Sequence, residues 1–454
     1  MGRHFSGASF STLAGLVGFG ALVRLVLLLE YPPLRQPDTS SYLLLAQQIA
    51  SLDLSSYDGG RTPMYPLLVI LGGQNAYSVY VMQTLLGIAA SVLLFLTALE
   101  LKRSYTLAVL VGLLPTVLLN QLFMEATLLT EHLSGVLAVG SLYVGVRLLK
   151  RGGRAGLMVL LGLLVAATTL TRPGYVALVP LYALVAFLAA QKERIASVGF
   201  YLAAACLPII GWMAFNAITV GQFGLSTRLG LNLINHSGAF IEYADSRYAT
   251  IRDVYLRHRA VVMSSPEALA HRGGEQYNTI YEALDDLKAA TGLSQVQLSR
   301  ELQKLSLDLF RRHPDRYAKS VFKAWLTYWA APNYWRPEAI RNPSLAKAMQ
   351  ALWYVEQPLI RLTNLALVLA VTFLALQVAL SAAKRGFSAI VTDRFLLALL
   401  LAGGSVYWFA LFQALIEFSE NGRYAIPTQQ IAVAFVIFYA CWLIDRRRAP
   451  RSTM

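Results

Sequence analysis

Ten apolar stretches, most of them long enough to cross a lipid bilayer, constrain this chain more than any other feature of its sequence. A helix of about 20 apolar residues spans the hydrocarbon core of a membrane. We therefore expect an all-α polytopic membrane protein with about ten transmembrane helices, two of which could form one unit broken around Arg172-Pro173. The predicted spans are roughly 10–30, 77–99, 105–121, 126–147, 156–171, 174–190, 196–216, 358–381, 395–416 and 424–444.

The composition agrees with lipid as the solvent around most of the chain. Charged residues make up only 14% of the sequence and hydrophobic residues 56%, whereas a soluble globular protein carries about 25% charged residues. Cys206 and Cys441 both lie inside apolar runs, which excludes a disulfide framework or a cysteine metal cluster. Residues 10–29 are too long for the apolar core of a cleavable signal, so we interpret them as the first span.

Basic residues are distributed unevenly between the two sets of alternating loops. One set carries sixteen of them, and the short loops of the opposite set carry four. The positive-inside rule therefore predicts that both termini are cytoplasmic and that residues 218–356 lie outside. The net charge of +14 is then largely a topology signal, which argues against a nucleic-acid partner. The sixteen are Arg3, Lys102, Arg103, Arg147, Lys150, Arg151, Arg154, Lys192, Arg194, Lys384, Arg385, Arg394, Arg446, Arg447, Arg448 and Arg451, and the four are Arg35, Arg61, Arg172 and Arg423.

Three parts follow from this topology, and each is expected to be helical. In the outer part, 275–311 show helical apolar spacing, and the break at Gly292-Leu293-Ser294 predicts two helices with Ser294 as an N-cap. The short apolar stretch 63–72 predicts a re-entrant or interfacial helix. The parts are an N-terminal transmembrane module at 1–217 with a first outer loop at 31–76, an outer helical segment at 218–356, and C-terminal transmembrane helices at 357–454.

Acidic residues near the outer ends of the predicted spans are candidates for chemistry. Asp38 follows the first span, and Thr39 or Ser40 could cap a short amphipathic helix there. A partly shielded carboxylate can act as a general base, and the structural alternative is that Asp38 merely begins that helix. Glu125 and Glu131 flank another outer turn. Ionisable groups at membrane depth are functional candidates, and the alternative for Glu131 is a solvated helix start, where the helix dipole favours an acid.

Arginines at the outer boundary are candidates for binding an anion. Arg172 lies in a Thr-Arg-Pro turn, and Arg423 lies at the outer start of the last span. A guanidinium group can hold a phosphate through two hydrogen bonds, or it can reach up to lipid headgroups. Arg24, inside the first span, could reach lipid headgroups or pair with an internal acid. The sequence contains no HExxH, CxxC, Walker loop or GxSxG motif.

Several motifs occur in an order that resembles the GT-C superfamily of glycosyltransferases. The likeness is to the branch that contains protein O-mannosyltransferases, the aminoarabinose transferase of lipid A and the bacterial Rgt-like enzymes. It departs from that branch where Thr39 follows Asp38, since the family often has an Asp-Glu pair there. The motifs are Arg24 in the first span, Asp38, Tyr42 and Ala46 as D-x3-Y-x3-A, Arg61 to Leu67 as R-x-P-x-Y-P-L, Thr130-Glu131-His132, Thr171-Arg172-Pro173, Arg312 to Tyr317, and Arg423-Tyr424 with Pro427.

The resemblance implies transfer of a sugar from a polyprenyl-phosphate donor to an acceptor hydroxyl of a lipid, glycan or protein on the outer face. It implies Asp38 as the base, with Glu131 positioning the acceptor or supporting Asp38. A single displacement would invert the anomeric centre. The resemblance implies no obligatory nucleotide sugar and leaves metal dependence open. The residues expected to bind the donor phosphate are Arg423, Arg172 and Arg61, and those expected to support the site are Tyr42, Tyr424, Arg24 and His132.

Two other classes of protein compete with a glycosyltransferase. A transporter or flippase of envelope lipids or glycans would also carry membrane arginines and acids, but here these groups gather at one face and no inverted repeat is visible. A catalytically inactive GT-C-like subunit would fit Thr39 in place of the second acid. In each case we expect a multi-pass protein of the bacterial inner membrane.

Overall fold

The computed structural model describes residues 7–102, 104–190, 193–270, 274–385 and 393–448. Within these ranges the regular elements are helices, and Leu34 and Thr127 form an isolated parallel β-bridge. The all-α fold is therefore confirmed. Four residues of the predicted cytoplasmic set, Arg3, Arg103, Lys192 and Arg451, lie outside the described residues.

Seven of the described helices are long and apolar enough to cross a membrane, and three shorter apolar segments accompany them. A chain in lipid must satisfy its backbone polar groups internally, which is why these apolar runs form helices. The seven are α1 (Gly7–Glu30), α4 (Ala76–Lys102), α8 (Thr130–Arg151), α11 (Arg194–Val220), α18 (Pro343–Arg385), α20 (Arg394–Ile416) and α21 (Asn421–Arg448). The shorter segments comprise α5 (Tyr105–Gly112) with α6 (Leu114–Val117), α9 (Ala155–Thr171), and η1 (Pro173–Ala177) with α10 (Leu178–Ala189).

The span predicted at 105–121 is not one helix. The chain is extended at Leu118, and a third short helix, α7 (Leu119–Met124), follows. The free N–H of Leu119 donates to the two carboxylate oxygens of Glu356 at 3.0 and 3.1 Å, so a residue of α18 satisfies the interrupted backbone. The next helix, α8, starts at Thr130 instead of residue 126.

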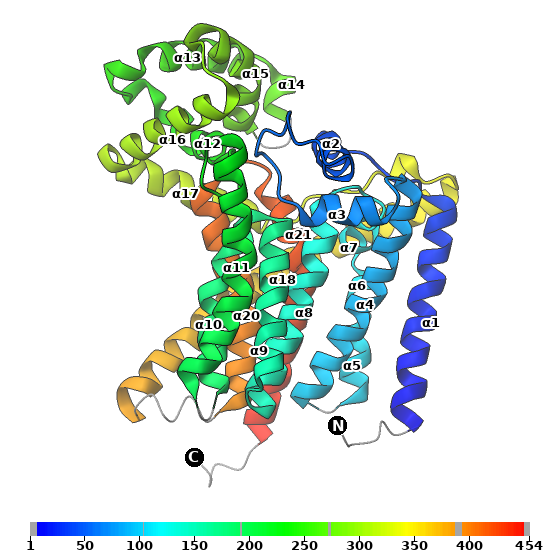
Figure 1. Ribbon diagram of the computed structural model, residues 1–454. Helices are drawn as coiled ribbons and strands as arrows, with labels where there is room; N and C mark the ends of the chain where they lie inside the picture. The colour runs from blue at the N-terminus through cyan, green and yellow to red at the C-terminus, as the bar shows by residue number, and fades with distance from the viewer. Residues whose placement is uncertain (1–6, 103, 191–192, 271–273, 386–392, 449–454) are drawn as a thin grey trace.

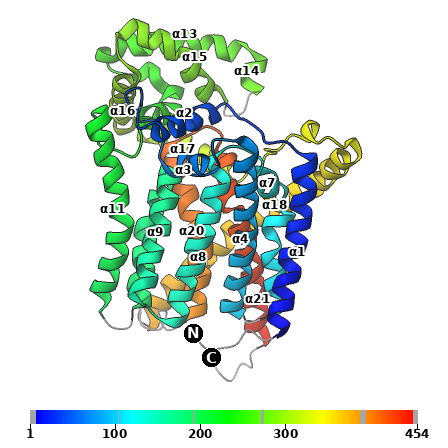
Figure 2. The same ribbon diagram turned by 45° about the vertical axis from the view of Figure 1, so that its right-hand side comes forward.

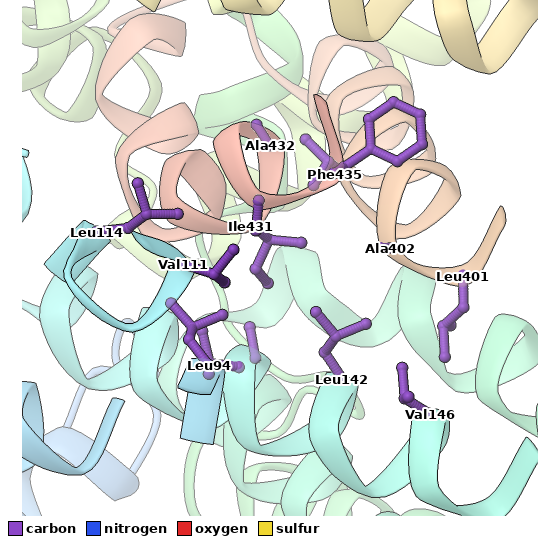
Figure 3. Close-up of a cluster of buried hydrophobic side chains, with 14 of the residues drawn as sticks. Leu94, Val111, Leu114, Leu142, Val146, Leu401, Ala402, Ile431, Ala432 and Phe435 are labelled. Atoms are coloured by element: carbon purple, nitrogen blue, oxygen red, sulfur yellow. The ribbon is translucent and has the colours of Figure 1, made fainter. Parts of the chain in front are cut away.

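The helix bundle packs around a continuous apolar core. α8 lies at its centre and contacts α4, α9, α10, α20 and α21. Figure 3 shows part of this core, where Leu142 of α8 lies among side chains of α4, α5, α20 and α21. α1 and α11 lie at opposite edges of the bundle (Figure 2). α1 begins and α21 ends at the end of the bundle that faces away from the outer helices (Figure 1).

The outer segment stands on the other end of the bundle and has a core of its own (Figure 1). The predicted break is confirmed, because α15 ends at Thr291 and α16 begins at Gln295. Ser294 caps α16 in a capping box with Gln297. The helices are α12 (Leu229–Ser237), η2 (Gly238–Tyr243), η3 (Ser246–Tyr248), α13 (Ala249–Ser264), α14 (Pro266–Ala270), α15 (Gly274–Thr291), α16 (Gln295–Arg312), α17 (Pro314–Tyr328) and η4 (Pro337–Ala339). α18 then runs from Pro343 without a break through residue 357, where we expected the C-terminal part to begin.

Two short helices of the first outer loop, α2 (Thr39–Ala50) and α3 (Met64–Leu71), lie over the outer ends of the bundle helices (Figure 2). They pack on α4 and α8 through a small apolar cluster that includes Tyr42 and Tyr65. α3 matches the short helix predicted at 63–72. The predicted cap at Thr39 or Ser40 is wrong, because Asp38 takes the N-cap position and Thr39 instead donates its hydroxyl to Leu128 O at 2.9 Å.

Candidate active site

Charged side chains from five segments that are distant in the sequence meet at the outer end of the bundle. They come from the residue before α2, the loop between α2 and α3, the first turn of α8, the break between α9 and η1, and the start of α21. Each segment ends or begins a helix at the same level, which is how residues far apart in the sequence come together. We call this cluster the arginine–carboxylate network, and it comprises Asp38, Arg61, Glu131, Arg172, Glu420 and Arg423.

Arg423 is the centre of the network. Its Nη2 lies 3.0 Å from Asp38 Oδ2, and its Nε lies 3.0 Å from Glu131 Oε1. Its remaining nitrogen, Nη1, lies 3.0 Å from Glu420 Oε2. A planar guanidinium group has donors on three sides, and here each side faces a carboxylate from a different part of the chain.

The other two arginines contact the carboxylates from the periphery. Arg61 Nη2 lies 2.6 Å from Asp38 Oδ1, and Arg172 Nη1 lies 2.8 Å from Glu131 Oε1. The Glu131 side chain is only 1% exposed, whereas that of Asp38 is 25% exposed. Glu131 is therefore the buried carboxylate of the network, and Asp38 is the more accessible one.

A close approach of α8 and α21 places Glu131 beside Arg423. A Cβ atom on Gly135 of α8 would lie 2.9 Å from the carbonyl oxygen of Pro427 in α21, so only glycine fits at this contact. Glu131 and Arg423 each lie four residues, about one helical turn, before these two contact positions. The tight packing of the two helices thus brings the acid and the arginine of their first turns together.

The outer segment holds the loop that carries Arg61. Thr227 donates its N–H to Gly59 O at 3.0 Å and its hydroxyl to Asp58 O at 2.9 Å. Gly59 has a φ of +72°, and a side chain there would collide with Thr227. Tyr57 donates its hydroxyl to the carbonyl oxygen of Arg61 at 2.8 Å. These contacts fix the backbone at Arg61 and explain how an exposed loop presents a guanidinium group to Asp38.

The electrostatic surroundings of Asp38 favour its charged form. Burial acts to raise the pKa of Asp38, but the guanidinium groups of Arg61 and Arg423 outweigh it and hold the pKa well below its usual range. Asp38 is therefore ionised at neutral pH. A carboxylate this strongly stabilised is a poor proton acceptor as long as both arginines remain against it.

Both predicted supporting tyrosines lie against the network. Arg61 donates to the hydroxyl of Tyr42 at 3.1 Å and stacks over its ring at 4.4 Å. Arg172 lies over the ring of Tyr424 at 4.6 Å. Tyr424 in turn donates its hydroxyl to the buried carboxylate of Glu417 at 2.8 Å.

Sequence reasoning missed the roles of Glu417 and Glu420. Both precede Arg423 in the loop between α20 and α21. The spacing of Glu420 three residues before Arg423 could have indicated the contact, because residues three apart face each other on a helix. Glu417 carries no such signal, since its partners, Ser419, Tyr424 and Gln413, are set by the fold of the loop.

Arg24 and His132 lie outside the network. Arg24 pairs with Glu125 at 2.7 Å, which confirms that it pairs with an internal acid, and both side chains are 2% exposed. Arg24 also donates to Thr116 Oγ1 at 2.9 Å. His132 is buried in the first turn of α8, next to Glu131 in sequence. The structure therefore assigns Arg24 and Glu125 to a second, separate ion pair.

The arrangement is suited to binding and displacing anions. Among the described residues, the network balances three guanidinium groups with three carboxylates, each carboxylate being in contact with at least one arginine. Within the described ranges, no group of three or more His, Cys, Asp or Glu side chains is placed to hold a metal ion. An incoming phosphate could bind here by replacing a carboxylate on one of the arginines.

Comparisons with known proteins gave two crystal structures. No family model and no curated protein matches the sequence. The structures are of ArnT from Cupriavidus metallidurans, one bound to undecaprenyl phosphate and one in the apo state. The first is 11% identical with a TM-score of 0.38 over 88% of this chain and 76% of that one. The second is 12% identical with a TM-score of 0.38 over 90% and 78%.

Proposed function

We propose that this protein is an integral membrane glycosyltransferase of the GT-C type. It transfers a sugar from a polyprenyl-phosphate donor to a hydroxyl group of a lipid, glycan or protein acceptor on the outer face of a bacterial inner membrane. The observation that carries the proposal is the position of Arg423 between Asp38 and Glu131 at the outer end of the bundle. One cluster thus contains a candidate base, Asp38, and cations for the leaving group, Arg423 and Arg172.

The reaction requires a base on one side of the anomeric carbon and fixed positive charge on the other. The acceptor oxygen attacks the anomeric carbon, and its proton passes to the carboxylate of Asp38. The bond from that carbon to the phosphate oxygen breaks, and the lipid phosphate leaves with the electron pair. Arg423 and Arg172 stabilise its charge, and Arg61 orients Asp38. One displacement inverts the anomeric centre.

Binding of the donor also explains how a strongly paired Asp38 could become a base. The phosphate of the donor competes with Asp38 for the Nη2 atom of Arg423, which lies 3.0 Å from the carboxylate in the structure. Moving that guanidinium group toward the phosphate removes one of the two cations that depress the pKa of Asp38. The proton affinity of Asp38 then rises only when the donor is in place, which protects the enzyme from activating an acceptor without a donor.

The test is turnover of a panel of polyprenyl-phosphate sugars by the purified protein. We compare wild type, Asp38→Asn, Arg423→Gln, and Asp253→Asn as a control, since Asp253 is an exposed residue of the outer segment. We expect Asp38→Asn to bind the donor without turning it over, Arg423→Gln to lose donor affinity, and Asp253→Asn to match wild type. Equal turnover by Asp38→Asn would eliminate Asp38 as the base and make Glu131 the next candidate.

Two outcomes would favour the competing classes of protein. If wild type binds a donor but never consumes it, even with a membrane extract that supplies acceptors, an inactive subunit is the better interpretation. If wild type in vesicles moves the lipid-linked sugar across the bilayer without cleaving it, the protein is a transporter.

A further inference from the structure

A pocket lies outside the arginine–carboxylate network, between the outer segment and the bundle. Its volume is about 410 Å³, which is within the range of small-ligand sites. Two aromatic side chains, Phe240 of η2 and Phe418 of the loop between α20 and α21, form part of its wall. The rest of the lining comes mainly from α17, where Arg316, Lys319 and Lys323 follow one another at helical spacing.

Basic residues outnumber acidic ones in the lining of this pocket. Asp315 is the one acidic residue of the lining. Neither Lys319 nor Lys323 forms an ion pair with any other described residue, and both side chains are exposed. Arg316 is held in place by the aromatic ring of Tyr243, over which it lies at 4.4 Å, and it donates to the hydroxyl of that tyrosine at 2.9 Å. The pocket therefore presents a net positive wall with one arginine already ordered.

The pocket lies next to one end of α20, a candidate membrane span. Tyr317 of α17 donates its hydroxyl to Leu415 O at 2.7 Å, which ties this helix to the outer end of the transmembrane helix α20. Beside the two lysines on the exposed side of α17, Phe322 is 58% exposed and Leu326 is 50% exposed. Exposed apolar side chains next to lysines, whose long stems can lie along apolar surface while the ammonium group stays in water, are typical of the membrane interface.

The wall of the pocket is also rigid. Ser320, which lines the pocket between Lys319 and Lys323, has its Oγ 2.8 Å from Nδ1 of the fully buried His236. The ring of His236 stacks on Phe418 at 6.1 Å. The backbone that carries the two lysines is therefore already held in place, so binding has to order only the lysine side chains.

We propose that this pocket binds the phosphate of a membrane lipid headgroup, with Lys319 and Lys323 on the phosphate and the acyl chains leaving along Phe322 and Leu326. The ligand chemistry follows from uncompensated cations in a pocket beside an exposed apolar helix face. The proposal does not rest on the activity suggested above. The pocket and the arginine–carboxylate network are separate sites. Phe418 lines the pocket, whereas its neighbour Glu417 accepts hydrogen bonds from Ser419 and from Tyr424, which lies against the network.

The test measures retention of phosphatidylglycerol by the full-length protein, by native mass spectrometry and by competition with a fluorescent phosphatidylglycerol. The variant is Lys319→Gln with Lys323→Gln, and the matched control is Lys288→Gln with Lys304→Gln, two outer-segment lysines already paired with acids. We expect about 10- to 30-fold weaker binding for the variant, since each basic residue near a membrane contributes about a factor of five. The control should bind as wild type does.

A conservative variant and a soluble probe complete the experiment. Lys319→Arg with Lys323→Arg keeps both charges and should retain the lipid, which separates loss of charge from loss of fold. Glycerol 3-phosphate and inorganic phosphate should compete only weakly, because they lack the acyl chains. Equal lipid retention by the glutamine variant and its control would overturn the proposal, and so would full displacement of the lipid by inorganic phosphate at micromolar concentration.

Discussion

Glu131 gives the sharpest test of the electrostatic balance inside the network. Glu131→Gln keeps the size of the side chain but removes the negative charge that faces Arg172 at 2.8 Å and Arg423 at 3.0 Å. Removing one partner of a buried pair costs about 3–5 kcal/mol. The two arginine side chains are 14% and 15% exposed, so water partly solvates them and we expect the lower end, about 3 kcal/mol.

The partner substitution should cost less. Arg172→Gln removes an ion pair but leaves Glu131 in contact with Arg423, so we expect a loss of about 1–3 kcal/mol, the cost of leaving a buried polar group partly unsatisfied. In the double variant, both the acid and one of its two cations are gone. The double variant should therefore be more stable than the sum of the single effects predicts, by about 1–3 kcal/mol.

The assay is equilibrium unfolding of the purified protein in mixed micelles of an anionic and a nonionic detergent, which gives the free energy of unfolding of all four proteins. Donor binding is measured on the same samples. A loss below 1 kcal/mol for Glu131→Gln, or strict additivity of the two single effects, would show that Glu131 is not held by the arginines in the way that the distances indicate.

Three further predictions concern other parts of the molecule. Gly135→Ala forces a Cβ to within 2.9 Å of Pro427 O and should lower the free energy of unfolding by about 1–3 kcal/mol in the same assay. The control Gly404→Ala has open space around the added Cβ and should raise the free energy of unfolding by up to about 1 kcal/mol. Burial raises the pKa of Asp38 but two arginines hold it below its ordinary 3.8, so its ion pairs stabilise the fold fully above pH 3.8 and are lost below it. Asp38→Asn should flatten the acid side of the plot of Tm against pH. Ser294→Ala removes a helix cap and should cost about 1 kcal/mol, seen as faster amide exchange in the first turn of α16.

Much of the fold could be predicted because lipid leaves few choices. An apolar run of sufficient length forms a helix, and the Gly292 break and the Ser294 cap are local signals that tertiary structure did not override. The interrupted span at 105–121 carries one local signal, because Pro115 lies inside it and proline disfavours a continuous helix. The position of the extended residue, Leu118, is not marked in the sequence. The extended turn persists because Glu356, 237 residues away, accepts the free N–H of Leu119.

The residues of the candidate site were easier to predict than their partners. Asp38, Arg172 and Arg423 are conspicuous as charges at the outer ends of apolar runs. The pairing of each acid depends on which helix ends meet in space. Arg24 was grouped with the site on sequence order, but its side chain leaves α1 toward Glu125. The sequence pattern alone does not show whether a given arginine pairs with Glu125 or with Glu131.

The ion pair of Arg24 and Glu125 has a consequence for the order of events during synthesis. Arg24 lies in α1, and its partner follows 101 residues later in the chain. At about 5–20 residues per second, the ribosome needs about 5–20 s to reach Glu125. During that interval the guanidinium group must stay near the headgroups at the outer end of α1. The final seating of α1 against α5 and α6 is therefore a late event, which a chain lacking Glu125 would not complete.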